Sequence, residues 1–360
     1  MHASDDLYDN VMAQASGAGR SRLRRGRALP MAAVVTLAAA GVLAVGGTAY
    51  GVASGAFFQT TMGDHGMGQE TNWSRQWKEG GETYRYVRQY QTVNPEDVSD
   101  DLSNAIEPVG YTIENGGYTL AVENMVADEN GCGIVQFTVS NPDGINIDTE
   151  GSQTNQLFLK SSDAAGDWLG IAFENLNDDG MNYRVYYDSK TATNTEVHAT
   201  MYFTPSKYIE GALDAGVRWG FTDSSGDPKK TVWSDTFTPS KLVGTRMFSD
   251  GAQAKVSLSP FSICYRANEA QFTADDGTTR YAEFVAGKLT LHKADGTDYR
   301  IKGTTSDGAD IVNDYVSTLL WDGNSASVFT QLIDTGDVTG VTMTGHQDGT
   351  DLAMELAPIE

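Results

Sequence analysis

The sequence predicts a mainly β protein, with a single N-terminal transmembrane helix followed by two tandem antiparallel β-sandwich domains. Three observations predict this arrangement. Residues 28–58 contain no charged side chain and follow a cluster of arginines. From residue 111 onward, apolar and polar residues alternate in short runs separated by Gly, Asp and Asn, as in antiparallel strands with one buried face. The sequence Phe-Thr-Pro-Ser-Lys occurs at 203–207 and again at 237–241, and the strand pattern restarts after the second copy.

The transmembrane helix is predicted over residues 28–58. Its most apolar part, Met31–Ala53, would rise about 35 Å as a helix, enough to cross a hydrocarbon core of about 30 Å. A cleaved secretory signal peptide is the alternative, because the small residues Ala53 and Gly55 suit a signal peptidase, but the apolar region of a signal peptide normally has about 7–15 residues. The residues that we expect within the bilayer include Met31, Leu37, Leu43 and Val52.

Positive charge before the apolar segment predicts its orientation, because basic residues that flank a membrane helix tend to stay in the cytoplasm. Residues 1–27 are therefore expected to form a cytoplasmic stub. The chain would be a single-pass protein of the plasma membrane, in contact with the lipid bilayer, with the bulk of its length extracellular. The residues that set this topology are Arg20, Arg22, Arg24, Arg25 and Arg27.

The N-terminal part allows two kinds of partner. The stub is either a docking segment for a cytoplasmic regulator or a disordered tail whose arginines only set the orientation. Gly47, Gly51 and Gly55 recur every four residues. Such a face of small residues lets two helices approach closely in lipid, so a helix-mediated dimer is the second kind of partner.

Charge is distributed unevenly along the chain of 360 residues, whose net charge is −23. The stub has three aspartates and five arginines, which leaves 45 acidic and 20 basic residues, a net charge of −25, in the remainder. A surface of this sign repels nucleic acid and anionic head groups. We therefore expect no nucleic-acid partner.

Residues 59–110 are predicted to form a stalk with a short helix. Phe57 and Phe58 precede it, where an aromatic belt at the membrane surface is expected. The helix would start at Asn94 and bury one apolar stripe. In the stalk, aromatic residues interleave with basic ones, which suits single-stranded nucleic acid, a sugar polymer, or packing of the rings on the first domain, and the extracellular location and negative charge favour packing. These residues are Trp73, Arg75, Trp77, Lys78, Tyr84, Arg85, Tyr86, Arg88 and Tyr90.

The two β domains are predicted at 111–241 and 242–360. A weak repeat relates residues 157–168 to residues 289–299, with an offset of 132 that also separates Cys132 from Cys264. Two domains of similar topology would produce this repeat. Outside the cell the two cysteines can form a disulfide, but equivalent positions in tandem domains rarely touch, so two separate thiols are favoured.

No residue pattern predicts chemistry, so no catalytic, metal-binding or cofactor-binding residue is assigned. The five histidines lack metal-ligand spacing, and the G-x-S-x-G and H-E-x-x-H motifs are missing from the sequence. His198 and His292 fall on the polar phase of strands and are expected to be exposed. The chain is therefore not expected to be an enzyme, although a hydrolase stays a third interpretation because triad residues can lie far apart in sequence.

The order of segments carries a resemblance to a family. The arginine-rich stub, the spanning segment, the sequence Gly-Tyr-Thr-Leu-Ala-Val-Glu at 117–123, Val-Ser-Leu-Ser-Pro-Phe-Ser-Ile at 256–263 and the Asp-Gly-Thr turn at 295–297 resemble bitopic envelope proteins of Gram-positive bacteria. The resemblance implies tandem immunoglobulin-like ectodomains of unknown function and, for some members, an anti-sigma-factor-like role. The stub departs from the zinc-type anti-sigma pattern, because His2 is its only histidine and it has no cysteine.

These expectations together predict a non-catalytic membrane protein with a sensory or regulatory ectodomain that meets a cell-envelope ligand or a protein partner. The alternative is a membrane-tethered module that binds or scaffolds the envelope without signalling.

Overall fold

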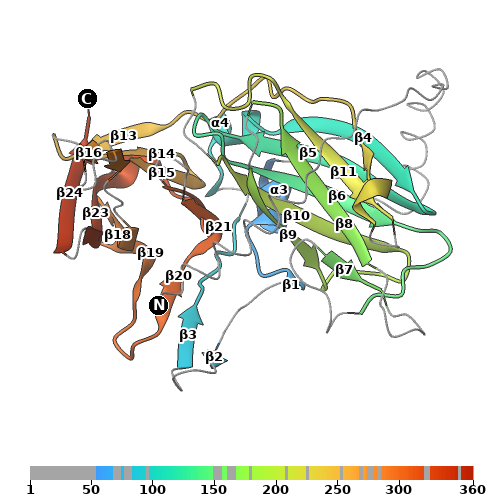
Figure 1. The fold of residues 1–360 in the computed structure, drawn as a ribbon, viewed down its shortest axis with the longest axis horizontal. Helices are drawn as coiled ribbons and strands as arrows, with labels where there is room; N and C mark the ends of the chain where they lie inside the picture. The colour runs from blue at the N-terminus through green and yellow to red at the C-terminus, as the bar shows by residue number, and fades with distance from the viewer. Residues whose placement is uncertain are drawn as a thin grey trace. The chain divides into compact units, whose positions relative to one another are not determined.

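The computed structural model describes residues 54–67, 74–76, 83–94, 97–148, 156–159, 168–177, 181–206, 210–223, 227–251, 254–266, 271–273, 279–281, 285–319, 325–347 and 350–359. Ser54–Glu360 is one compact unit, and it is mainly β (Figure 1). The predicted stub with its five arginines, and Met31, Leu37, Leu43 and Val52, lie outside the described residues. In the described part of the chain, the helices are too short or too polar to cross a bilayer.

The first β part consists of two antiparallel sheets whose strands follow α4 (Asp100–Asn104), except for β1, which precedes it. Six strands form one sheet in the order β1 (Gly66–Met67), β9 (Asn182–Asp188), β10 (Glu196–Thr204), β6 (Gly133–Ser140), β5 (Tyr118–Ala127) and β4 (Glu107–Asn115). Four strands form the other in the order β12 (Val232–Trp233), β11 (Val217–Thr222), β8 (Trp168–Asn175) and β7 (Gln156–Phe158), and the 3-10 turn η2 (Pro228–Lys230) precedes β12.

The two sheets bury one hydrophobic cluster between them, and the predicted alternation explains which residues enter it. Successive side chains of a strand point to opposite faces. The apolar phase of β6, Val135, Phe137 and Val139, is accordingly buried in this cluster, which also contains Trp219 and Phe221 of β11. The alternating strands predicted in this region are confirmed, and a turn at residues 141–144, Asn-Pro-Asp-Gly, follows β6, with Gly144 at a φ of 110°.

The hydroxyl of Tyr187, in this cluster, is expected to affect the free energy of unfolding. Tyr187 is fully buried, and among the described residues no partner lies within hydrogen-bonding distance of its hydroxyl. An unpaired buried hydroxyl costs about 1–3 kcal/mol. Tyr187→Phe is therefore expected to raise the free energy of unfolding by about 1 kcal/mol in urea titrations, whereas an equal or lower value would mean that the hydroxyl has a partner.

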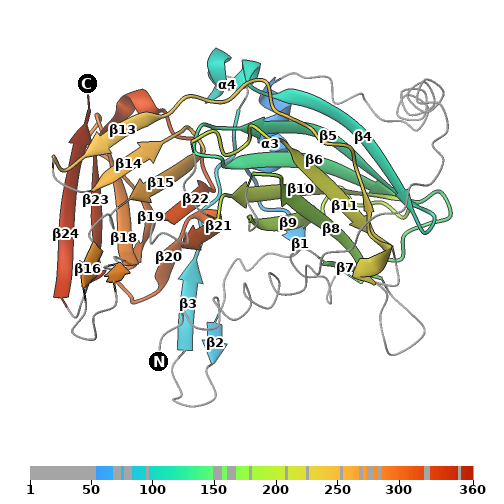
Figure 2. The same ribbon diagram turned by 45° about the horizontal axis from the view of Figure 1, so that its top comes forward.

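The second β part is one continuous antiparallel sheet that nearly closes into a barrel, extended at one edge by a hairpin (Figure 2). Ten strands follow the order β20 (Asp310–Val312), β19 (Asp298–Thr304), β18 (Val285–Lys293), β23 (Val338–Gln347), β24 (Thr350–Pro358), β13 (Arg246–Ser249), β14 (Lys255–Leu258), β15 (Ser262–Arg266), β22 (Ser325–Phe329) and β21 (Asp314–Leu319). The hairpin is β2 (Ser74–Gln76) with β3 (Thr83–Val87), and β3 pairs with β20 in parallel. The remaining elements are a separate hairpin, β16 (Gln271–Thr273) with β17 (Thr279–Tyr281), and the 3-10 turn η3 (Thr335–Asp337).

A single residue joins the two edges of the ten-strand sheet. Asn313 lies between β20 and β21, which are the first and last of the ten strands. Its side chain accepts a hydrogen bond from the backbone N–H of Gln89 at 2.7 Å and donates one to the carbonyl of Arg300 at 2.8 Å. The prediction that the second β part is a sandwich of two sheets is wrong, because its strands form one continuous sheet. Alternation shows which face of a strand is buried but not which strands pair.

The described residues of the predicted stalk (59–110) belong to the folded unit and do not form a separate stalk. α3 (Ser54–Thr61) has Phe57, Phe58 and Thr61 buried, β1 is an edge strand of the six-stranded sheet, and β3 pairs in the second β part. The predicted short helix exists but starts later, because Ser99 caps α4 by accepting a hydrogen bond from the N–H of Leu102. Its apolar stripe is buried as predicted and consists of Val98, Leu102, Ala105 and Ile106.

Candidate functional site

A hydrophobic cluster separate from the cores of the two β parts contains residues from both of them and from α3. We call this cluster the shared core. Its members come from α3, α4 and their flanking residues, from the outer face of the six-stranded sheet, and from the barrel-like sheet. They are Phe57, Phe58, Met62, Val93, Val98, Leu102, Ala105, Ile106, Val126, Cys132, Ile134, Tyr186, Tyr202, Val243, Phe261, Cys264, Tyr315, Val316, Ala326 and Val328.

α3 brings the first described residues of the chain into the shared core. Phe57 and Phe58 are buried there, with their rings edge to face at 5.0 Å. The prediction that these two rings form an aromatic belt at a membrane is wrong, because protein covers them. Residues 54–58, the last five of the predicted membrane segment, are thus part of the folded unit, whereas Met31–Ala53 lies outside the described residues.

Each β part holds the chain that follows α3 through one tyrosine hydroxyl. Tyr202 of β10 donates a hydrogen bond to the carbonyl of Thr61, and Tyr315 of β21 donates one to the carbonyl of Gly63 at 3.0 Å. The two rings are stacked, with centroids 3.8 Å apart. Gln136 of β6 also donates to the Thr60 hydroxyl at 2.6 Å. Both β parts therefore contact the C-terminal end of α3 directly.

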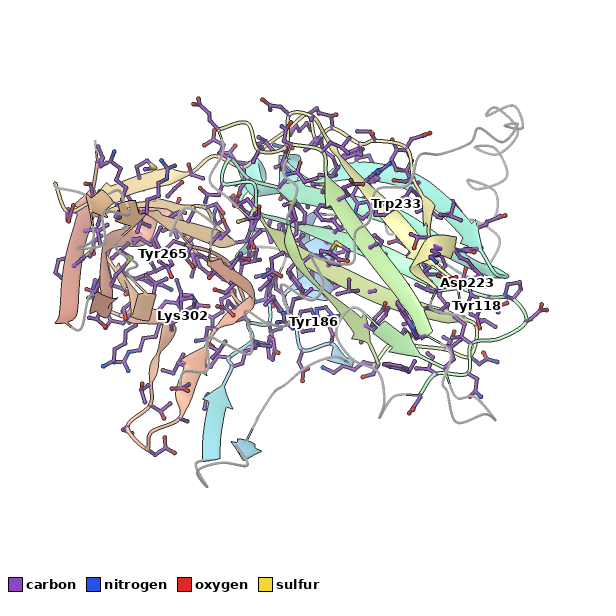
Figure 3. The ribbon with its side chains drawn as sticks, viewed as in Figure 1. Tyr118, Tyr186, Asp223, Trp233, Tyr265 and Lys302 are labelled. Atoms are coloured by element: carbon purple, nitrogen blue, oxygen red, sulfur yellow. The ribbon has the colours of Figure 1, made fainter. Side chains whose placement is uncertain are left out.

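Tyr186, labelled in Figure 3, extends this aromatic cluster between β9 and β21. Its hydroxyl donates to the carbonyl of Tyr315 at 2.8 Å, and its ring is 5.5 Å from that of Tyr202. Tyr90 lies 5.8 Å from Tyr315, and Arg88 donates to the carbonyl of Val312 at 3.1 Å. Of the predicted aromatic and basic stalk residues, Arg88 and Tyr90 thus pack on the folded unit, and the side chains of the others lie outside the described residues.

His65 is buried beside these tyrosines. Its Nε2 is 2.8 Å from the Tyr202 hydroxyl, and because that hydroxyl gives its proton to Thr61, His65 is the donor in this contact. Burial lowers the pKa of His65 to about 4, although Asp188 opposes the shift. Burial also raises the pKa values of Tyr202 and Tyr315 well above the ordinary range. His65, Tyr202 and Tyr315 are therefore uncharged near pH 7.

A second polar group joins the two β parts around Asp128, which is fully buried. Its carboxylate accepts hydrogen bonds from the hydroxyls of Ser259 and Ser262 in the second part, and from the backbone N–H groups of Asn130 and Cys132 in the first. Burial raises the pKa of Asp128 to about 6, and the four hydrogen bonds limit the shift.

The two cysteines are free thiols in the structure, and both are buried in the shared core. Burial raises the pKa of Cys132 well above its usual value, with smaller contributions from Asp128 and Cys264. The prediction of two separate thiols is confirmed, although both residues belong to the same hydrophobic cluster. A pKa raised in this way keeps the Cys132 thiol protonated and unreactive.

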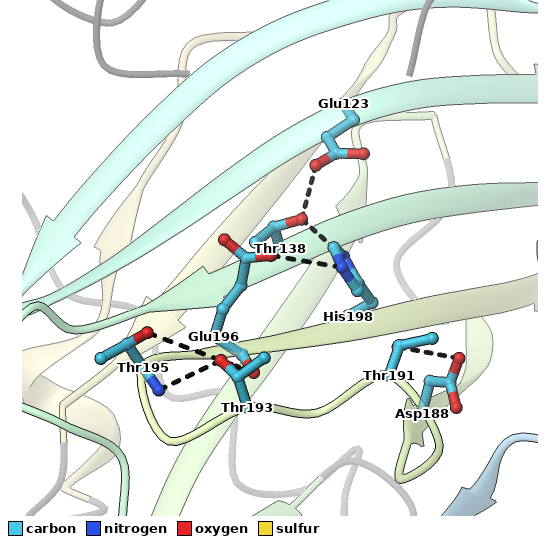
Figure 4. A network of polar contacts seen from close by, with 8 residues as sticks. All are labelled: Glu123, Thr138, Asp188, Thr191, Thr193, Thr195, Glu196 and His198. Atoms are coloured by element: carbon cyan, nitrogen blue, oxygen red, sulfur yellow. Dashed lines mark hydrogen bonds and ion pairs between the residues drawn. The ribbon is translucent and has the colours of Figure 1, made fainter. Parts of the chain in front are cut away.

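The histidines predicted on exposed strand positions are half-exposed and belong to polar ladders across the strands. His198 bonds through Nδ1 to Thr138 at 3.0 Å and through Nε2 to Glu196 at 3.3 Å (Figure 4). Thr138 gives its own proton to Glu123 at 2.5 Å, so His198 cannot take that proton as a general base would. His292 repeats this arrangement with Asp298, Thr342 and Glu355.

The shared core, unlike these ladders, gives a physical route between segments that are far apart in sequence. Its hydrogen bonds and ring contacts connect the C-terminal end of α3 with β10 and with β21. A displacement of α3 therefore has to break or rearrange contacts in both β parts. In the sequence, the signal for this core is that β9 and β10 carry apolar residues on both phases at one end, as in Val185-Tyr186-Tyr187 and Met201-Tyr202-Phe203.

Comparisons with known proteins give a limited result. No family model matches the chain, and no curated protein does so either. A solved structure that resembles the chain is the conserved domain protein from Bacillus anthracis, with a TM-score of 0.35, 13% sequence identity, and coverage of 71% of this chain and 90% of that one. A likeness of this size carries no inference about function.

Proposed function

We propose that the chain is a non-catalytic, single-pass protein of the plasma membrane whose ectodomain senses a ligand outside the cell and passes that state to the cytoplasmic stub. Residues 28–53 are the anchor in this proposal, and the five arginines keep the stub inside. The resemblance to bitopic Gram-positive proteins adds immunoglobulin-like ectodomains and an anti-sigma-factor-like role to the proposal. A tethered scaffold without signalling is the competing function.

The observation that supports signalling over scaffolding is the position of α3. Ser54, its first residue, directly follows Ala53, and its residues Phe57 and Phe58 are buried in the core that both β parts share. A tether works equally well through a flexible linker. A chain that leads from the anchor into the core without any linker instead couples movement of the anchor to the packing of the ectodomain.

A linker insertion tests this proposal. An insertion of eight Gly and Ser residues between Ala53 and Ser54 is expected to leave the amount of membrane-bound protein unchanged. Cells with this insertion are expected to show the transcription profile of cells that express the protein without residues 1–19. The same insertion after Asp307, in the exposed turn between β19 and β20, is the matched control and is expected to leave the profile of wild-type cells. If deletion of residues 1–19 changes no transcript, signalling is refuted. If the deletion changes the profile and the insertion before Ser54 does not, coupling through α3 is refuted.

A further inference from the structure

The outer face of the four-stranded sheet presents two tryptophans around a strip of small residues. Residues that pair across neighbouring strands share a face. Gly220 of β11 pairs with both Trp233 of β12 and Ala172 of β8, and Thr222 of β11 pairs with Gly170 of β8. Trp168 shares this face because it lies two residues before Gly170 on the same strand. The opposite face of the sheet carries the core residues Leu169, Ile171, Phe173, Val217, Trp219 and Phe221.

Both indole rings lie against this sheet instead of projecting from it. A side chain at Gly170 would collide with the Trp168 ring, and one at Gly220 would meet the Thr231 methyl at 2.6 Å and Trp233 ring carbons at 3.1 Å. The glycines thus provide the space that the rings occupy. Because Gly170 and Gly220 are diagonal neighbours, about 7–8 Å apart, the rings flank a surface whose intervening side chains are no larger than threonine.

A pair of planar charged groups completes this face. Arg218 forms an ion pair with Glu174, its partner across the strands, and its Nε donates to the same carboxylate at 2.5 Å. The guanidinium carbon of Arg218 lies 4.8 Å from the centroid of the Trp233 ring. Trp233 is 37% exposed, and Arg218 and Glu174 also reach solvent. We call Trp168, Trp233, Arg218 and Glu174 the tryptophan face.

We propose that the tryptophan face binds a neutral polysaccharide chain, with sugar rings stacked on Trp168 and Trp233 and sugar hydroxyls hydrogen-bonded to Arg218 and Glu174. Aromatic rings over glycines also stabilise a sheet, but that role is complete without exposure of the ring. Tryptophan and arginine are enriched among the residues that contribute most of the binding energy at protein interfaces.

Charge is the reason to choose a neutral sugar chain as the occupant. Arg218 and Glu174 compensate each other, so the tryptophan face has no net charge to attract an ionic ligand. The chain beyond the stub has a net charge of −25, which repels polyanions. A flat surface with aromatic rings and paired hydrogen-bonding groups matches a sugar chain, which has apolar ring faces and uncharged hydroxyls. This inference rests on the proposed extracellular location and names the ligand class of that function.

Calorimetric titration of the full chain tests the proposal. The protein is kept in a detergent without a sugar head group, and the probes are the hexamers of β-1,4-linked glucose and of β-1,4-linked N-acetylglucosamine, with polygalacturonate as the polyanion. At least one neutral hexamer is expected to bind, and polygalacturonate is not. Trp168→Ala and Trp233→Ala are each expected to weaken binding by at least about tenfold.

Two matched variants separate recognition from folding. Trp233→Tyr keeps a ring at the same position and is expected to retain most of the affinity. If Trp233→Ala does not fold, Trp233→Tyr still tests whether a ring at this position is enough for binding. Leu242→Ala removes an exposed apolar side chain outside the face and is expected to bind as the wild type does. Binding that both tryptophan variants retain, binding of polygalacturonate alone, or no binding of either hexamer would overturn the proposal. None of these results alters the outcome of the linker experiment, so the two proposals fail separately.

Discussion

Phe58→Ala is expected to lower the free energy of unfolding by about 3–5 kcal/mol, the usual cost of removing a buried phenylalanine ring. Phe58 is completely buried in the shared core and packs edge to face on Phe57. The size of this effect depends on α3 being part of the core, because a ring in a stalk or at a membrane surface would contribute little to the stability of the ectodomain.

Urea unfolding of the full chain in detergent, followed by tryptophan fluorescence, measures this effect. Leu242→Ala is the matched control, since the exposed Leu242 side chain is expected to change the free energy of unfolding by less than about 0.5 kcal/mol. A loss below about 1 kcal/mol for Phe58→Ala would show that α3 does not stabilise the unit.

The second large effect concerns the free energy of unfolding, to which His65 and Asp128 contribute with opposite dependence on pH. Burial lowers the pKa of His65 to about 4 from 6.5, so the unfolded state binds more protons between these values and the stability that neutral His65 allows is lost as the pH falls through them. Burial raises the pKa of Asp128 to about 6 from 3.8, so the folded state binds more protons there and stability is lost as the pH rises. Each shift corresponds to about 3 kcal/mol.

These two contributions nearly cancel between about pH 4 and pH 6, and single variants are expected to reveal them. As the pH is lowered from 7 to 4, the free energy of unfolding of His65→Gln is expected to rise relative to the wild type by about 3 kcal/mol, and that of Asp128→Asn to fall by about 3 kcal/mol. Comparison with the wild type at each pH removes the contribution of all other groups.

The double variant is the control for this prediction. Its free energy of unfolding is expected to differ from the wild type by a nearly constant amount over the whole range. Parallel curves for either single variant and the wild type would mean that the residue concerned titrates as it does in the unfolded chain.

Local sequence patterns predicted the strands well because a strand with one buried face alternates. Val135, Phe137 and Val139 lie in the first core as that alternation requires, and the weak repeat corresponds to two antiparallel pairs, β7 with β8 and β18 with β19. Alternation carries no information about pairing, so the continuous sheet of the second β part and the edge-to-edge connection at Asn313 could not be derived from it.

The shared core was missed for a different physical reason. Its residues come from segments as distant as Phe57 and Val328, and no periodicity within one segment relates them. The segment before residue 107 looked like a stalk because its apolar residues are few. Those few, among them Phe58, Val93 and Leu102, are buried by strands that follow much later in the chain.

The tryptophan face could not be predicted from the sequence either, because its residues are brought together only by strand pairing. Trp168 and Trp233 are 65 positions apart in the sequence, and only the pairing of β8, β11 and β12 places them on one face. The glycines that make room for the rings read as ordinary turn or strand-weakening residues until the register is known.

Anchoring is the central claim, and the most direct measurement is the N-terminal sequence and location of the chain recovered from cells. We expect a chain that sediments with membranes, begins within residues 1–27, and loses its β parts but not its stub to protease added outside intact cells. A chain that begins near residue 56 and is recovered from the medium would contradict it.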